Sequence, residues 1–304
     1  MKVINTYQLS KIERQELQKI LLNIYCDVAE VCKKYKLRIM MGGGSCLGAV
    51  RHKGFIPWDD DIDLLMPRDD YNKLLAVFEK ELGEKYCLVD MLTTKMGQHT
   101  FAKIMKKNTT FLEPCTNLNT SPAGIFVDLF PLEYLPEKYL NRSIFLFFAN
   151  IFTKLINTII GYQLCSTPHK IIGWSTSFMS VYKWVVLYTS FISACRGSKF
   201  FFLPSGGHGV YAEILPADTF FPLSIGYFEG IKVNLPRNPD LYLKNLYGNY
   251  MKLPPMDKRQ GEHPVIKFST IYSEKDLIEI EIDETEIINN QISIENTLHT
   301  IVHM

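Results

Sequence analysis

The sequence predicts an α+β fold, in which helices flank a mixed β-sheet. Three observations predict it. A long amphipathic helix opens the chain, short apolar runs of strand length alternate with further helical patterns, and 47% of the residues are apolar while 21% are charged. The 304 residues fit one large domain or two modest ones around a packed core.

Caps, glycines and periodicity define the elements of the first half. Ser10 and Glu13 have the spacing of a capping box, and apolar residues then recur at helical spacing, which predicts a helix over residues 11–35. Residues 37–41 predict a short buried strand. It ends at three glycines that turn into a short helix near residues 46–51. Five further elements are predicted, a helix over 69–82 and strands over 61–66, 87–91, 100–106 and 124–129.

Two apolar segments fill the middle of the chain, residues 144–165 and 171–195, and each contains a lysine, Lys154 and Lys183. Because a membrane-spanning helix needs about 20 apolar residues with few charges, three alternatives stay open. The segments span a membrane, lie in its interface, or pack within the protein.

Turn and cap residues define the rest. Residues 220–236 predict a hairpin with Glu229–Gly230 near its turn, and Asn238–Pro239 has the pattern of a helix start. Residues 278–283 alternate as an edge strand does.

Composition argues against several classes of protein. The net charge of +1, without a long basic run, argues against nucleic acid as a partner. Seven cysteines without a C-x-x-C pair argue against zinc and a disulfide framework, and fit thiols in a reducing compartment. Residues 1–11 lack the apolar core of a signal peptide, so the expected location is the cytoplasm.

The strongest chemical signal lies in residues 42–71. Glycines 42–44 lead into three basic residues at 51–53 and then into Asp59, Asp60, Asp61 and Asp63. Such clustered carboxylates repel one another unless a divalent cation binds them. Glycines and basic groups suit phosphate, so the simplest ligand is a nucleotide phosphate chelated to Mg²⁺.

Spacing assigns roles within this signal. Asp61 and Asp63 would share one face of a strand and hold Mg²⁺ or Mn²⁺. The turn at Gly43 and Gly44 would point N–H groups at a phosphate, with the Ser45 hydroxyl nearby. A solvated loop is the alternative for the acids, and the apolar residues at 55–58 argue against it.

A distant acid completes the candidate site. Asp128 lies inside an otherwise apolar strand, where a lone carboxylate is costly to bury. It is therefore expected to face the same metal or an acceptor hydroxyl.

Residues 43–52 and 55–63 resemble the LicD family, which includes bacterial phosphocholine transferases and shares its domain with fukutin and its relatives. The resemblance covers about residues 20–263, and it departs from the family at Asn249, where members often carry Asp. Further matching segments lie at 101–104, 108–109, 128–132, 228–230, 247–251 and 253–259.

The resemblance implies a nucleotidyltransferase-like fold and an activity. A phospho-alcohol, phosphocholine above all, would pass from a CDP-alcohol to a sugar hydroxyl of a cell-surface glycan such as lipopolysaccharide or teichoic acid, and CMP would leave. Catalysis and metal binding would fall to Asp61, Asp63 and Asp128, with Asp128 as third ligand or general base. The candidate phosphate contacts are Gly43, Gly44, Ser45, Arg51, His52, Lys53, Lys103 and Arg259.

The same resemblance divides the chain into four regions. Residues 1–139 would form the catalytic core and 140–200 an apolar helical insertion, as a membrane-interface or acceptor region. Residues 201–270 would complete the core, and 271–304 form a tail of unknown role. The apolar insertion favours a lipid-linked acceptor and peripheral contact with the inner face of the cytoplasmic membrane.

Two other functions remain open from the sequence. One is a nucleotidyltransferase that attaches a nucleotide to a sugar phosphate or protein and releases pyrophosphate. The other is a non-catalytic module of glycan assembly. Four aromatic residues are candidates for a cage around choline, namely Trp58, Tyr71, Phe130 and Tyr134.

Overall fold

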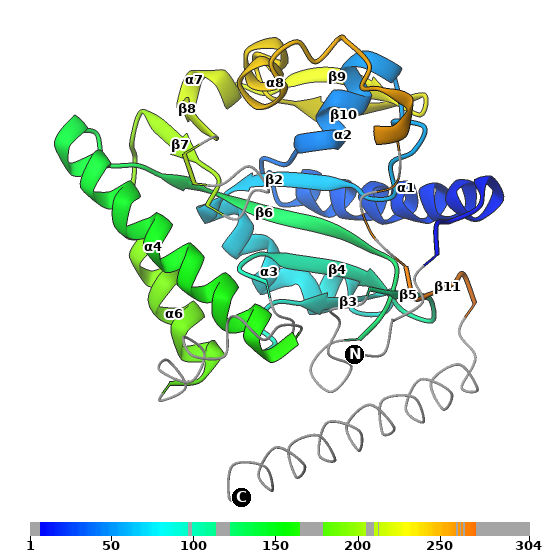
Figure 1. Ribbon diagram of the computed structural model, residues 1–304, viewed down its shortest axis with the longest axis horizontal. Coiled ribbons are helices and arrows are strands. Elements are labelled where there is room, and N and C mark those ends of the chain that lie inside the picture. Colours follow the sequence, from blue (N-terminus) through cyan, green and yellow to red (C-terminus); the bar gives the residue numbers. More distant parts are fainter. Residues whose placement is uncertain are drawn as a thin grey trace, which may run out of the picture.

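The computed structural model describes residues 7–96, 99–113, 122–164, 179–204, 210–211, 213–259, 261, 263 and 265–271. Helices and strands alternate along the chain and build one curled mixed sheet with helices around it (Figure 1). The predicted mixed α+β fold is confirmed. The expected strand over 278–283 and the tail beyond it lie outside the described residues.

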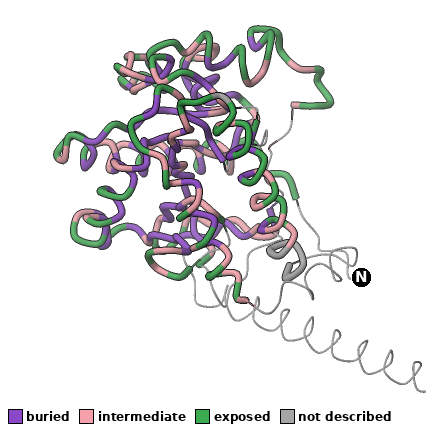
Figure 2. Tube along the Cα trace, turned by 90° about the vertical axis from the view of Figure 1, so that its left-hand side faces the viewer, coloured by how far each residue is buried: buried purple, intermediate pink, exposed green. Residues whose placement is uncertain are grey.

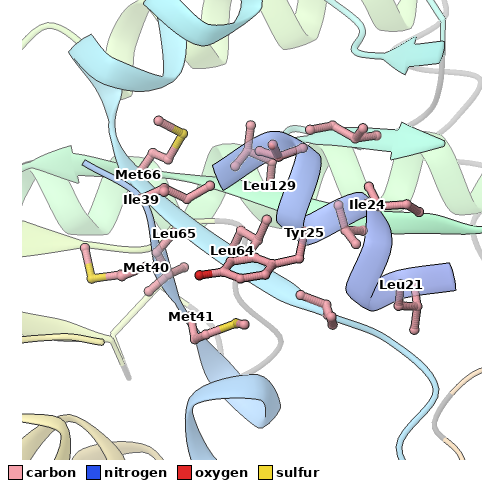
Figure 3. Close-up of a cluster of buried hydrophobic side chains, with 14 of the residues drawn as sticks. Leu21, Ile24, Tyr25, Ile39, Met40, Met41, Leu64, Leu65, Met66 and Leu129 are labelled. Carbon is pink, nitrogen blue, oxygen red and sulfur yellow. The ribbon is translucent and has the colours of Figure 1, made fainter. Parts of the chain in front are cut away.

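Helix α1 (Lys11–Lys34) begins where the capping box predicts. The Glu13 N–H donates to Ser10 Oγ over 3.3 Å, and the Ser10 N–H donates to Glu13 Oε2 over 2.8 Å. Its buried side packs on the sheet, and Figure 3 shows Tyr25 of this helix beside Leu64 of a strand, with Ile24 and then Leu21 further along the helix. The helix thereby covers the middle of the main core.

The central sheet has the strand order β1-β2-β6-β4-β3. Strands β2 and β6 run parallel, whereas β1, β4 and β3 pair antiparallel with their neighbours. Two short strands extend the sheet where β7 pairs with the end of β6 and β8 pairs with β7. The bounds are β1 (Met40–Met41), β2 (Asp63–Pro67), β3 (Tyr86–Val89), β4 (Ala102–Lys106), β6 (Phe126–Tyr134), β7 (Phe200–Phe202) and β8 (Ile214–Pro216).

Strand β6 is longer than the sequence predicts because it continues past Pro131. A proline lacks the N–H that a sheet ladder needs. Strand β4 pairs with β6 only as far as Leu129, and β7 pairs from Glu133 onward. Pro131 falls between these two stretches, where its missing N–H breaks no pair on that side.

Three helical elements connect these strands. Helix α2 (Gly43–Leu47) starts at the glycines themselves, earlier than predicted, and continues into a single π-helical turn, η1 (Gly48–His52). Helix α3 (Arg68–Leu82) follows β2 directly and agrees with the predicted helix to one residue. Within α3, Leu74, Leu75 and Phe78 are buried and Val77 is half-buried.

The C-terminal elements close over α2 and η1. The predicted hairpin is confirmed as β9 (Ser224–Phe228) and β10 (Ile231–Leu235), with Glu229–Gly230 at its turn. The predicted helix start is also confirmed, because Asn238 caps α8 (Pro239–Tyr247). The remaining elements are α7 (Ala217–Phe220), the 3₁₀ turn η3 (Met256–Lys258), and the paired strands β5 (Thr110–Leu112) and β11 (Lys267–Ser269).

The two apolar segments contain α4 (Tyr139–Leu164) and α6 (Val181–Ile192), which pack side by side at one end of the sheet (Figure 1). With Phe202 of β7 and Leu135 they form a second hydrophobic core. Within the described residues, no helix is long and apolar enough to cross a membrane.

Candidate active site

Three polar side chains stand side by side across three neighbouring strands. Asp63, the first residue of β2, pairs in register with Asp128 of β6, and Asp128 pairs with Lys103 of β4. Directly paired residues project on the same face of a sheet. The fold therefore brings together residues that lie 40 and 65 positions from Asp63 along the chain, as the sequence predicted for Asp128.

Asp61 takes a different place from the one predicted. The strand begins at Asp63 rather than Asp61, so the two acids are not strand neighbours on one face. They still interact electrostatically. Burial, and then the negative charge of Asp61, raise the pKa of Asp63 well above its usual value, and the charges of Asp128 and Asp59 add to the effect. The cluster is thus built from the end of a loop and two strand starts.

Lys103 is the buried cation of this cluster. Its ammonium lies 3.3 Å from Glu113 Oε2, 3.7 Å from Asp128 Oδ1 and 3.4 Å from the centre of the Phe126 ring. Burial raises the pKa of Asp128, and the positive charge of Lys103 acts against that rise. Apart from this ion pair with Lys103, the buried Asp128 Oδ1 has no hydrogen-bond partner.

The glycine turn is fastened to the first acid of β2. The Asp63 N–H donates to Ser45 Oγ over 2.9 Å, and the Gly42 N–H donates to the Asp63 carbonyl over 2.9 Å. Gly43 has a φ of +43°, and a Cβ atom there would lie 2.5 Å from Asp63 Oδ2. A Cβ atom at Gly44 would lie 3.3 Å from Asp59 Oδ2. Only glycine lets the backbone approach the carboxylates this closely.

A residue from the far end of the chain holds the same turn. The Gly43 N–H donates to the Tyr242 hydroxyl of α8 over 3.0 Å, and the Tyr242 hydroxyl bonds to the buried carboxylate of Glu213. This line of contacts fixes the turn from behind. No sequence motif singles out Tyr242 or Glu213, although the Asn238–Pro239 cap predicts the start of α8.

The predicted basic residues gather at the end of η1. Arg51 donates to the Tyr250 carbonyl over 2.6 Å, and the Arg259 guanidinium lies 5.5 Å from the centre of the Trp58 ring. Burial lowers the pKa of Arg51, the charge of Asp59 opposes this, and the positive charge of Arg259 adds to it. Two guanidinium groups that repel each other favour an anion between them.

The other two basic residues differ in setting. His52 meets the edge of the Trp58 ring with centroids 6.4 Å apart, and burial together with Arg51 lowers its pKa. Lys53 is exposed in the left-handed region with a φ of +63°, and its carbonyl accepts from the Glu229 N–H. His52 is the last residue of η1, and Lys53 follows it directly.

Asp60 faces a histidine that the sequence did not single out. Its Oδ1 lies 2.8 Å from His263 Nδ1, and its Oδ2 accepts from the His263 N–H over 3.3 Å. Burial lowers the pKa of His263, but the bond to Asp60 and the charges of Asp61 and Asp60 outweigh it and raise the pKa to about 10. The protonated ring thus offsets one charge of the acid cluster.

The four aromatic residues considered for a choline cage have separate neighbours. Tyr71 is buried and bonds to Asp90, and Phe130 packs on Phe101. Tyr134 packs on Phe201, while Trp58 lies beside His52 and Arg259. These contacts give no support to one shared cage, and only Trp58 contacts the basic cluster.

The donor set fits a divalent cation delivered with a substrate. In the part of the chain that the structure describes, no three His, Cys, Asp or Glu side chains already stand as a metal-binding group. Mg²⁺ is commonly held by one or two carboxylates, with water and substrate phosphates as the other ligands. The repulsion around Asp63 is a feature that such a cation would relieve.

The site thus combines a glycine turn, crowded carboxylates and two arginines, Arg51 and Arg259, whose charges act on each other. Residues 36–151 match the model of the LicD/FKTN/FKRP nucleotidyltransferase domain. These residues are therefore similar to the LicD/FKTN/FKRP nucleotidyltransferase domain, and the resemblance that the motifs indicated is confirmed. The matched residues include every candidate site residue except Arg259.

Curated relatives agree with this family. The chain is 28% identical over 270 residues to the lipopolysaccharide cholinephosphotransferase LicD of Haemophilus influenzae (strain Rd), which covers 84% of this chain and 97% of that protein. An uncharacterised protein of Rickettsia typhi is 31% identical over 83 residues, 26% of this chain and 25% of that protein. The chain is thus a distant homologue of LicD, matched over nearly the full length of that enzyme.

Proposed function

We propose that the protein is a metal-dependent transferase that moves a phospho-alcohol from a CDP-alcohol to a sugar hydroxyl of a glycan. Phosphocholine is the first candidate for the transferred group, and a cell-surface or lipid-linked glycan is the proposed acceptor. The observation that carries the proposal is the alignment of Asp63, Asp128 and Lys103 beside a glycine turn. The homology to a cholinephosphotransferase supports the choice of substrate class.

The proposed reaction balances as a substitution at phosphorus. The acceptor oxygen attacks the β-phosphorus of the CDP-alcohol, the bond from that phosphorus to the bridging oxygen breaks, and CMP leaves with that oxygen. The hydroxyl proton passes to a base. Catalysis of this kind depends on positioning and on electrostatic stabilisation.

The side chains divide this work between donor and acceptor. Asp61 and Asp63, with Asp128 as the third candidate, would hold Mg²⁺ or Mn²⁺, which when bound neutralises charge on the diphosphate. Arg51 and Arg259 would contact the donor phosphates. Asp128 is also the candidate base, since it pairs in register with Asp63 and burial raises its pKa.

One assay tests the proposal and its alternatives. The full chain, with Mg²⁺, is offered a panel of CDP-alcohols and nucleoside triphosphates together with a glycan acceptor. We expect CMP release from one CDP-alcohol, dependent on Mg²⁺ and abolished by EDTA. Pyrophosphate release from a triphosphate would instead favour a nucleotidyltransferase, and inactivity with all donors would favour a non-catalytic module.

Paired variants assign the acids. Asp61→Asn and Asp63→Asn should each lower CMP release at least 100-fold while the fold remains intact by circular dichroism. Asp69→Asn is the matched control, because Asp69 belongs to the same acidic stretch but forms a surface pair with Arg196 over 2.7 Å. Full activity in both Asp61 and Asp63 variants would contradict the metal assignment.

The cytoplasmic location stays a prediction from sequence.

A further inference from the structure

The middle of the chain has an unusual charge. From residue 138 to residue 212 it contains no Asp or Glu at all. The region is thus purely basic in sequence, whereas the other residues carry 26 Lys and Arg against 32 Asp and Glu, eight of these acids lying in residues 272–304. The cations of this region are Lys138, Arg142, Lys154, Lys170, Lys183, Arg196 and Lys199.

Helix α4 in this region is apolar on two opposite sides. One side, with Phe145, Leu146, Ala149 and Ile156, is buried in the second core. The other side is exposed, and its large side chains recur at a spacing that keeps them within one stripe of about 100°. The stripe consists of Leu140, Ile144, Phe147, Phe148 and Ile151, with exposed fractions from 46 to 69%.

Charged and aromatic residues accompany the stripe. Lys154 is exposed and follows Ile151 by three positions, which places it at the margin of the stripe. Helix α6, packed on α4, exposes Leu187, Tyr182 and Lys183. Figure 2 looks onto the side of the molecule on which α4 and α6 lie. Exposed apolar side chains and exposed lysines thus both lie on the α4–α6 helix pair.

We propose that this surface, the α4 stripe with its flanking cations, binds the face of an anionic lipid bilayer. The apolar side chains would enter the headgroup region, and the lysines would meet lipid phosphates. An interfacial helix of this kind joins large apolar residues to basic ones. No described helix is suited to spanning. A second copy of the chain would bring the same positive charge and be repelled, which disfavours self-association.

Binding to lipid vesicles tests the proposal directly and needs no enzymatic activity. The full chain is sedimented with vesicles of phosphatidylcholine alone and with vesicles that also contain phosphatidylglycerol. We expect binding to the anionic vesicles at least tenfold above binding to the neutral ones, and a steep decrease with added salt. The result does not depend on the proposed transfer reaction, so the two can fail separately.

Variants locate the contact. Phe147→Asp with Phe148→Asp should lower vesicle binding at least tenfold, and Lys154→Glu should lower it severalfold at low salt only. Ile12→Asp is the matched control, since Ile12 is 70% exposed on helix α1 and outside the stripe. If the double Asp variant loses its fold, Phe147→Ser with Phe148→Ser replaces it, because these side chains are outside the core.

Three outcomes would overturn the proposal. The first is equal binding by the wild type and the stripe variants. The second is equal binding to neutral and anionic vesicles. The third is a wild-type dimer in solution that the stripe variants lose, since a second copy would then cover the stripe.

Discussion

Gly43 shows how a single residue joins the fold to the candidate chemistry. Its φ of +43° is a conformation that side-chain-bearing residues rarely adopt, and its Cα faces the Asp63 carboxylate. Its N–H is held by Tyr242, so the turn is fixed on both sides. Such a residue should matter more to activity than to stability, because the group that it would displace is a proposed catalytic one.

We therefore expect Gly43→Ala to lower CMP release at least tenfold. The strain of about 1 to 2 kcal/mol at a positive φ would be accompanied by displacement of Asp63. Gly197→Ala is the control, since Gly197 also has a positive φ of +63° but open space around it. Activity assays and urea unfolding of both variants check this. Equal losses of activity in the two would contradict the role of the turn.

Glu213 gives the protein a readable pH dependence. Burial raises the pKa of its carboxyl from 4.5 to about 7, although the bond from Tyr242 acts in the opposite direction. Between these two values the folded state binds more protons than the unfolded state, so stability falls as pH rises from about 4.5 to 7. The shift corresponds to at most about 3 kcal/mol.

Glu213→Gln should remove this part of the pH dependence, because the amide does not titrate and can still accept from Tyr242. Urea unfolding at pH 5 and pH 8 would show a smaller loss of unfolding free energy in the variant than in the wild type. An identical loss in both proteins would mean that Glu213 is not the titrating group.

Several elements could be predicted at the scale of helices and strands, and the reasons are local. The capping box at Ser10 and the Asn238–Pro239 cap are contained in a few adjacent residues, and both helices begin there. Strands β5, β7, β8 and β11 have only three residues each, and they exist because distant segments pair with them. No local sequence pattern predicts such strands.

The candidate site divides in the same way. The motif in residues 42–71 predicts the glycine turn and the acids of the loop that follows it. The register between β2, β6 and β4 determines which distant residues lie beside Asp63. Tyr242, Glu213 and His263 come from the last third of the chain, and no spacing rule connects them with residue 43 or residue 60. They were accessible only through the folded structure.

The junction of β2, α3 and β6 contains a buried ion pair between Arg68 and Glu133. Arg68 Nε donates to Glu133 Oε1 over 2.7 Å, both side chains are nearly inaccessible, and the guanidinium also lies 4.8 Å from the centre of the Tyr71 ring. Glu133→Ala would leave a buried, unpaired guanidinium. We expect a loss of about 3 to 5 kcal/mol in unfolding free energy.

Thermal and urea unfolding measure this loss, with Asp69→Asn as the comparison. Asp69 follows Arg68 in the same helix and pairs with Arg196. Because both side chains of this pair are about half exposed, loss of the pair should lower the unfolding free energy by less than about 1 kcal/mol. Comparable losses of unfolding free energy in the two variants would show that the buried Arg68–Glu133 pair contributes no more to stability than the exposed Asp69–Arg196 pair.

At the scale of the whole molecule, the two proposed functions lie at opposite ends of one strand. Asp128 lies near the start of β6, and α4 follows soon after its end at Tyr134. At ~3.3 Å per residue the two ends of this stretch are about 20 Å apart. The acid cluster and the proposed bilayer contact are therefore separate surfaces, so variants in one should leave the other intact.

The acid cluster also sets a balance between stability and activity for the whole chain. Asp63 is half-buried near Asp61, Asp128 and Asp59, and their mutual repulsion disfavours the folded state without a cation. Asp63→Asn should thus raise the unfolding free energy by roughly 0.5 to 2 kcal/mol while it abolishes CMP release.

Mg²⁺ with CDP-choline should raise the melting temperature of the wild type, and less so or not at all that of the Asp63→Asn variant. Asp69→Asn should gain no stability and keep the response to the ligands. A less stable Asp63→Asn protein would mean that the carboxylate is favourable in the fold, and the cation would then not be needed to explain the cluster.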